Sequence, residues 1–153
     1  MDNIAIMRIL RAFVPVVGLS ILSFVGVAAA ELAPDETVNK YLSAMQGQRF
    51  SEAFDYVSIG LRGGKDREAW SKEQQYIVQM GEVKIFGFKT FKPVIDGAKA
   101  KVPNILKSQD KFLNQLGLDE YEIYELIMEE GAWRIDQQTL VEGPEKDEYF
   151  PKE

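Results

Sequence analysis

Apolar residues in the first half of the chain, after residue 33, recur at the spacing of α-helices. A face repeating at i, i+3, i+4 and i+7 predicts a helix over residues 34–47. Ser51 is placed to cap a short second helix, and a third is expected over residues 66–80. The apolar stripes consist of Val38, Tyr41, Leu42 and Met45 in the first helix and of Trp70, Ile77 and Met80 in the third.

After Gly81 the pattern changes from helical to extended. Residues 83–91 are rich in β-branched and aromatic side chains, Asp96-Gly97 predicts a two-residue turn, and a second strand follows over residues 98–106. Pro103 has no N–H for a neighbouring strand, which predicts an edge strand or a bulge. This turn places Lys92 opposite Lys101.

A second hairpin is expected near the C-terminus, because residues 120–129 and 132–141 alternate around a Glu130-Gly131 turn. Its pairs are Met128 with Trp133, Leu126 with Ile135 and Tyr124 with Gln137 on one face, and Ile127 with Arg134 and Glu125 with Asp136 on the other. Between the hairpins, the apolar residues Phe112, Leu113 and Leu116 are expected to point inward. Residues 143–153 read as a flexible acidic tail.

Helices followed by antiparallel hairpins define an α+β fold, in which N-terminal helices pack on one face of a curved antiparallel sheet. This order and several short motifs resemble the nuclear-transport-factor-2-like superfamily, which is cystatin-like and cone-shaped, and in particular its small exported bacterial members of unknown function. The motifs are Asp35-Glu36-Thr37-Val38, Tyr41-Leu42, Arg49-Phe50-Ser51-Glu52-Ala53-Phe54, Trp70 and Glu129-Glu130-Gly131-Ala132-Trp133-Arg134-Ile135-Asp136. The resemblance implies one conical domain over residues 31–142 and a sheet face that can pair two copies into a homodimer. It does not choose between enzymes, ligand binders and interaction modules.

The first thirty residues resemble an export signal. Arg8 and Arg11 precede an apolar run over residues 12–30 that ends with Ala28 and Ala30 at the −3 and −1 positions of a cleavage site. Cleavage would release a periplasmic or secreted protein. Alternatively, the 19 residues of the run are enough to span a bilayer and remain as an inner-membrane anchor, with the domain outside the cytoplasm.

Composition narrows the chemistry that the chain can perform. Its 153 residues include no His and no Cys, which excludes disulfides, thiol nucleophiles, histidine bases and zinc sites with nitrogen or sulfur ligands. The net charge of −6 makes nucleic acid an unsuitable partner. We expect no metal and no cofactor, because no phosphate-binding or calcium-binding loop is present.

Two sets of residues are candidates for a binding site. The first would line the mouth of the cone or build its core, and consists of Tyr41, Phe54, Trp70, Tyr124, Trp133, Glu125, Arg134 and Asp136. Within it, Arg134 can neutralise the facing carboxylates of Glu125 and Asp136, as a solvated ion network or a polar binding cluster. The second set is a basic patch, suited to an acidic partner or to the protection of an exposed strand edge. It consists of Lys92, Lys99 and Lys101.

The absence of a catalytic pattern predicts a non-enzymatic, exported accessory protein that binds an envelope protein or a small apolar molecule. Two alternatives remain open. One is a membrane-anchored small subunit of a larger complex. The other is an isomerase or hydro-lyase whose base is a carboxylate, with Asp55 or Asp136 as the candidates.

Overall fold

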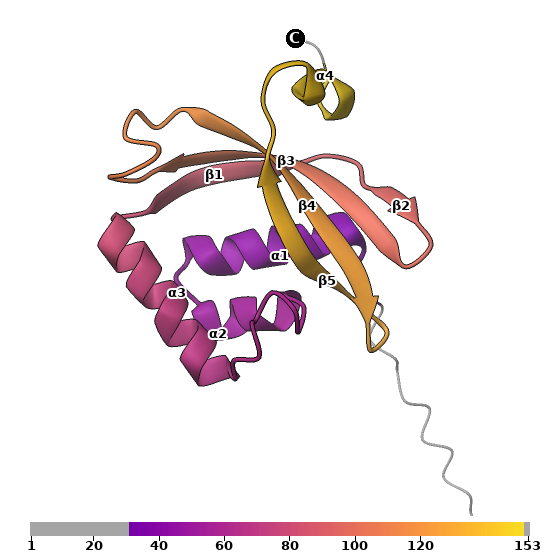
Figure 1. Ribbon diagram of the computed structural model, residues 1–153, viewed down its shortest axis with the longest axis horizontal. Coiled ribbons are helices and arrows are strands. Elements are labelled where there is room, and N and C mark those ends of the chain that lie inside the picture. The colour runs from indigo at the N-terminus through magenta and orange to yellow at the C-terminus, as the bar shows by residue number, and fades with distance from the viewer. Residues whose placement is uncertain (1–30, 152–153) are drawn as a thin grey trace, which may run out of the picture.

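A computed structural model of the chain describes residues 31–151, in which three helical segments cover one face of a curved sheet (Figure 1). The helices on this face are α1 (Pro34–Gln46), α2 (Phe50–Ala53) and α3 (Arg67–Gly81), and the short 3-10 helix η1 (Phe54–Tyr56) follows α2. The strands are β1 (Lys84–Thr90), β2 (Val94–Asp96), β3 (Lys99–Gln109), β4 (Asp119–Glu129) and β5 (Ala132–Leu140). The chain then forms η2 (Gly143–Glu145) and α4 (Lys146–Tyr149). The expected α+β order is confirmed.

The predicted signal peptide and its alternative, the membrane anchor, occupy residues 1–30 and lie outside the described residues. Within residues 31–151, no helix is both long enough and apolar enough to cross a membrane.

Local signals explain where the helices begin. Pro34 occupies the first turn of α1, where its missing N–H costs no helical hydrogen bond. Asp66 caps α3, because its carboxylate accepts a hydrogen bond from the backbone N–H of Ala69 at 2.8 Å. The expectation that Ser51 caps the second helix is wrong. Helix α2 begins at Phe50, one residue before Ser51, and the Phe50 side chain is buried in the core.

Strand β3 is central, so the prediction of an edge strand at Pro103 is wrong. The sheet order is β1-β3-β4-β5, and β2 pairs with β3 beyond the end of β1. Pro103 faces the connection between β1 and β2, where the N–H of Phe91 donates to its carbonyl at 2.9 Å. The missing N–H of the proline therefore interrupts no ladder.

The register of the first hairpin also differs from the prediction. Gly97 adopts a positive φ of 56°, and the loop is Gly97-Ala98, so that Asp96 pairs with Lys99. Val94, and not Lys92, therefore lies opposite Lys101.

The second hairpin follows the predicted register only near its turn. Its Glu130-Gly131 turn has positive φ at both residues, 50° and 76°, and the expected pairs of Met128, Leu126 and Ile127 are confirmed. A bulge at Asp136 then shifts the register by one residue. Glu125 lies opposite Gln137 and Tyr124 opposite Gln138, which corrects both predicted pairs.

The bulge has a cause in a distant segment. The hydroxyl of Ser58 donates to the Asp136 carboxylate at 2.6 Å, and the neighbouring Val57 bridges Ile135. These contacts hold Asp136 out of the ladder.

The main core lies between the helices and the concave face of the sheet. Its buried members include Val38, Leu42, Phe54, Trp70, Val102, Leu106, Tyr124, Leu126, Trp133 and Ile135. A second, smaller cluster lies on the opposite face, which α4 partly covers (Figure 1).

The C-terminal segment is part of the fold, which corrects the prediction of a flexible tail for residues 143–151. Phe150 is only 6% exposed and packs edge-on against Phe91 and Tyr121, with ring centroids 5.4 and 5.0 Å away. Burial of this aromatic ring offsets the entropy lost when the segment is ordered.

Candidate functional site

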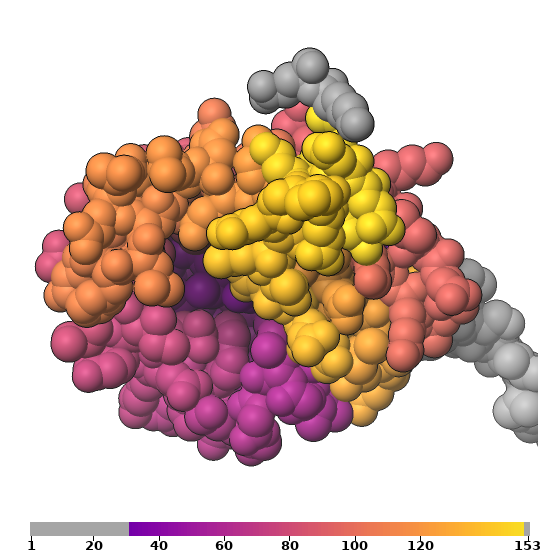
Figure 2. All heavy atoms as spheres, turned by 45° about the horizontal axis from the view of Figure 1, so that its top comes forward, coloured from indigo at the N-terminus to yellow at the C-terminus, as the bar shows by residue number. Residues whose placement is uncertain are grey.

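The helices leave one end of the concave face uncovered. Along β5, Trp133 and Ile135 are buried under the helices, whereas Gln138 and Leu140 on the same face are exposed. Figure 2 shows a hollow on this side of the molecule, between the β3–β4 loop (orange) and the C-terminal segments (yellow), with α1 (indigo) at its floor. We call this end of the concave face the mouth. It comprises the exposed Gln138 and Leu140, the half-buried Tyr41, and three buried residues, Asn104, Glu122 and Tyr124.

A buried carboxylate lies in the mouth. Glu122 is 1% exposed, and its Oε2 accepts hydrogen bonds from Asn104 Nδ2 at 2.9 Å and from the Tyr124 hydroxyl at 3.1 Å. Its Oε1 accepts one from Gln138 Nε2 at 2.6 Å. All three donors are neutral, and no ion pair within residues 31–151 includes Glu122. A buried carboxylate without a cation is costly, so this arrangement is unusual.

This environment shifts the titration of the neighbouring groups. Burial raises the pKa of Glu122 above its usual range, although the three hydrogen bonds to its carboxylate partly oppose that shift. Burial and the nearby Glu122 raise the pKa of Tyr41 to about 12, and the same two causes raise that of Tyr124. Both tyrosines therefore remain hydrogen-bond donors at neutral pH.

The β3–β4 loop borders the mouth and exposes its apolar side chains, which contradicts the inward orientation expected from sequence. Phe112, Leu113 and Leu116 are 62%, 93% and 83% exposed. The carboxylate of Asp110 accepts the backbone N–H groups of Phe112, Leu113 and Asn114 at 2.6, 2.7 and 3.1 Å. Polar contacts thus hold the loop, and its apolar side chains stay available at the surface.

The aromatic candidates divide between the core and the mouth. Phe54 and Trp70 form an edge-on pair with centroids 5.8 Å apart, and Trp133 is buried beside Ile135. Only Tyr41 and Tyr124 belong to the mouth, where their rings also meet edge-on at 6.2 Å. Phe54 and Trp70 are core residues, whereas Trp133 also lines a separate cavity of about 250 Å³ with Tyr56 and Arg134.

Comparisons with known proteins concern the fold alone. No protein-family model and no curated protein matches the chain. A SEC-C motif containing protein from Rhodopseudomonas palustris has a similar structure, with 11% identity and a TM-score of 0.57 over 72% of this chain and 80% of that one. A domain of unknown function from Nostoc punctiforme, with a cystatin-like fold, matches at 9% identity and a TM-score of 0.52 over 75% and 79% of the two chains. This chain has a cystatin-like fold. An NTF2-like protein of unknown function from Cytophaga hutchinsonii is also similar, at 11% identity and a TM-score of 0.45 over 72% and 92% of the two chains.

The remaining candidates lie on the other face of the cystatin-like sheet. Glu125 forms an ion pair with Lys101 at 3.4 Å, and Asp136 is bound by Ser58, so neither makes the expected network with Arg134. Arg134 instead lies opposite Ile127. Lys99 and Lys101 line a cavity of about 350 Å³ together with Glu125 and Asp136, whereas Lys92 does not. The predicted polar cluster and basic patch therefore share one surface, remote from the mouth.

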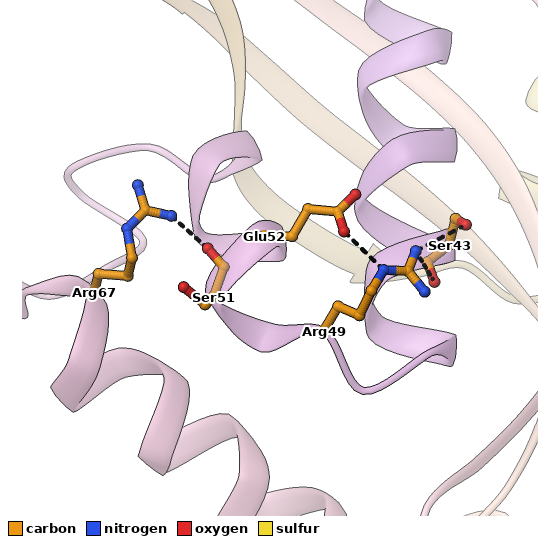
Figure 3. A network of polar contacts seen from close by, with 5 residues as sticks. All are labelled: Ser43, Arg49, Ser51, Glu52 and Arg67. Atoms are coloured by element: carbon orange, nitrogen blue, oxygen red, sulfur yellow. Dashed lines mark hydrogen bonds and ion pairs between the residues drawn. The ribbon is translucent and has the colours of Figure 1, made fainter.

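Asp55, the other candidate base, lies at a helical corner of the cone and not in the mouth. There Arg67 donates to Asp55 at 2.5 Å. Arg67 also donates to the carbonyl of Ser51, and Arg49 pairs with Glu52 at 2.7 Å (Figure 3). These contacts tie α2 to its neighbours along the chain. Within residues 31–151, no group of three or more acidic side chains is arranged to hold a metal ion.

Glu122 was not among the residues singled out from sequence. The signal that could have found it is the alternation in β4, which places Glu122 on the same face as Tyr124 and Leu126. An acidic residue at a core-facing position of a strand indicates a buried polar group.

Proposed function

We propose that this chain is a non-catalytic binding domain that takes up a small, largely apolar molecule in its mouth. The observation that carries the proposal is the uncovered concave face, where the exposed Leu140 lies directly opposite the buried Glu122. Ligand sites are typically apolar hollows with a few polar groups that converge on one point. The mouth offers Leu140 as an apolar surface and Glu122 and Asn104 as polar groups that converge, and the cystatin-like fold suits a binding or accessory role.

The hydrogen bonds of Glu122 support binding over catalysis. Catalysis by a carboxylate base in such a site also needs an O–H or N–H donor that is free to stabilise the developing oxyanion of the substrate. Here the Tyr124 hydroxyl donates to Glu122 itself, and two amides occupy the same carboxylate. The alternative of an isomerase or hydro-lyase would require Glu122 as its base, since Asp55 and Asp136 are bound elsewhere.

Titration with a neutral apolar dye, N-phenyl-1-naphthylamine, tests the proposal. The dye should gain fluorescence on binding to the wild type. Leu140→Asp should weaken binding about tenfold or more, because a Leu side chain contributes about 1.5–3 kcal/mol when buried. Leu61→Asp is the matched control: Leu61 is also exposed, at 41%, but lies beside the buried Ser58. No dye binding, or equal losses in both variants, would contradict the proposal.

Export to the cell envelope is a second part of the proposal, supported by the apolar run and the Ala28 and Ala30 cleavage pattern. Mass spectrometry of the protein from its native host tests it. An N-terminus at Glu31 supports a cleaved, accessory envelope protein. An intact N-terminus would instead favour the membrane-anchored subunit, in which residues 12–30 remain.

A further inference from the structure

The acceptor groups in the mouth are not fully used. A carboxylate can accept about four hydrogen bonds, and Glu122 receives three. Asn104 is 0% exposed, and its Oδ1 has no hydrogen-bond partner, although its Nδ2 donates to Glu122. An unpartnered buried acceptor beside a buried carboxylate is rare in folded proteins. Asn104 Oδ1 and the Glu122 carboxylate can each accept a further hydrogen bond from a donor.

Within residues 31–151, no Lys or Arg forms an ion pair with Glu122. The polar groups that face this region include the Tyr41 hydroxyl and Asn39 from α1, Thr90 from β1, Ser108 from β3, Glu120 from β4 and Gln138 from β5. Ser108 donates to Glu120 at 2.5 Å and so does not serve Glu122. All of these groups are neutral or acidic. The local field therefore favours a positively charged guest.

Of the three residues that donate hydrogen bonds to Glu122, only Gln138 is exposed to solvent. Gln138 is exposed, and its amide covers Glu122 Oε1. Rotation of this side chain would open the carboxylate without any change in the backbone. Next to it, Leu140 offers an apolar surface on the same face of the sheet.

From these contacts we propose that the ligand is an amphipathic primary amine, whose ammonium group binds Glu122 and Asn104 Oδ1 while its apolar chain lies along Leu140. The three N–H donors of an ammonium match the acceptor positions left open on these two residues. Hydrogen bonds to charged groups are stronger than neutral ones, which gives selectivity for the amine. This inference rests on the proposed function, because it assigns the chemical class of the ligand in the same mouth.

The test is displacement of N-phenyl-1-naphthylamine by n-octylamine, n-octanol and octanoate at pH 7.5. An alkylammonium keeps its proton up to about pH 10, so n-octylamine is cationic in this assay. We expect n-octylamine to displace the dye at a concentration about tenfold or more below that of n-octanol, and octanoate to be the weakest.

Two variants separate the carboxylate from its surroundings. Glu122→Gln should abolish the preference for the amine, whereas Glu125→Gln, the same change on the opposite face of β4, should keep it. Wild-type affinity for n-octylamine should also rise with pH as Glu122 ionises, while affinity for n-octanol stays constant. That measurement holds even if Glu122→Gln fails to fold.

The outcomes distinguish the two proposals. Equal displacement by n-octylamine and n-octanol would overturn the amine assignment and leave apolar binding in the mouth intact. A dye that binds nowhere, or that Leu140→Asp does not affect, would overturn the proposed function itself. A preference for the amine that survives in Glu122→Gln would place the cation site elsewhere and also refute the assignment.

Discussion

Phe150→Ala should destabilise the whole fold, although Phe150 lies three residues before the end of the chain. Its ring is 6% exposed and makes edge-on contacts with Phe91 and Tyr121 at 5.4 and 5.0 Å. Truncation of a buried Phe costs about 3–5 kcal/mol, and edge-on pairs contribute part of this. Because the cluster is peripheral and can partly collapse, we expect about 3 kcal/mol, or roughly 10 °C in melting temperature.

Urea unfolding followed by tryptophan fluorescence measures this loss, and hydrogen exchange locates it. The amide of Phe150, which donates to the Lys146 carbonyl, should exchange much faster in the variant. Phe112→Ala is the matched control, because its ring is 62% exposed and the same truncation should change stability by at most about 0.5 kcal/mol. Equal effects of the two substitutions, or a loss below about 0.5 kcal/mol for Phe150→Ala, would show that the segment is not docked.

Other substitutions test the mouth, the loop and the turn. In the wild type, the raised pKa of Glu122 means that its contribution to stability is fully present below pH 4.5 and is lost as the pH rises through the folded pKa. Glu122→Gln should remove this pH dependence of the free energy of unfolding, measured in urea across pH. Asp110→Ala should speed hydrogen exchange of the Phe112 and Leu113 amides. Hydrogen bonds from these amides lower the pKa of Asp110, so the wild type should show the same change only as the pH falls through that lowered pKa. Gly131→Ala should cost about 1–2 kcal/mol because of its φ of 76°, whereas Gly87→Ala, with open space and no positive φ, should cost less in the same thermal melts.

The sequence predicted those elements whose causes are local. The helix over residues 34–47 and the Glu130-Gly131 turn depend on capping residues, periodicity and turn geometry within a few positions. The failures have distant causes. The bulge at Asp136 depends on Ser58, which is 78 residues earlier, and burial of Phe150 depends on Phe91.

The candidate site was only partly predictable for the same reason. Tyr41 and Tyr124 could be chosen as aromatic residues on an apolar face, but their role in the mouth depends on Glu122, which lies on β4 two residues before Tyr124 and accepts a hydrogen bond from its hydroxyl. The acidic residues of β4 do not lie on one face of the sheet. The alternation of the strand divides them: Glu125 meets Lys101 on one side of the sheet, and Glu122 lies in the mouth on the other.

The energetics of Glu122 connect the stability of the fold to its proposed ligand. Ionisation of this buried group destabilises the empty protein, because its three hydrogen-bond donors are neutral. A positively charged ligand should offset this loss of folding stability, because a molecule that binds only the folded state stabilises it. The gain in melting temperature with n-octylamine should therefore grow over the same pH range in which the empty protein weakens. If the two pH dependences do not coincide, the ammonium group does not bind at Glu122.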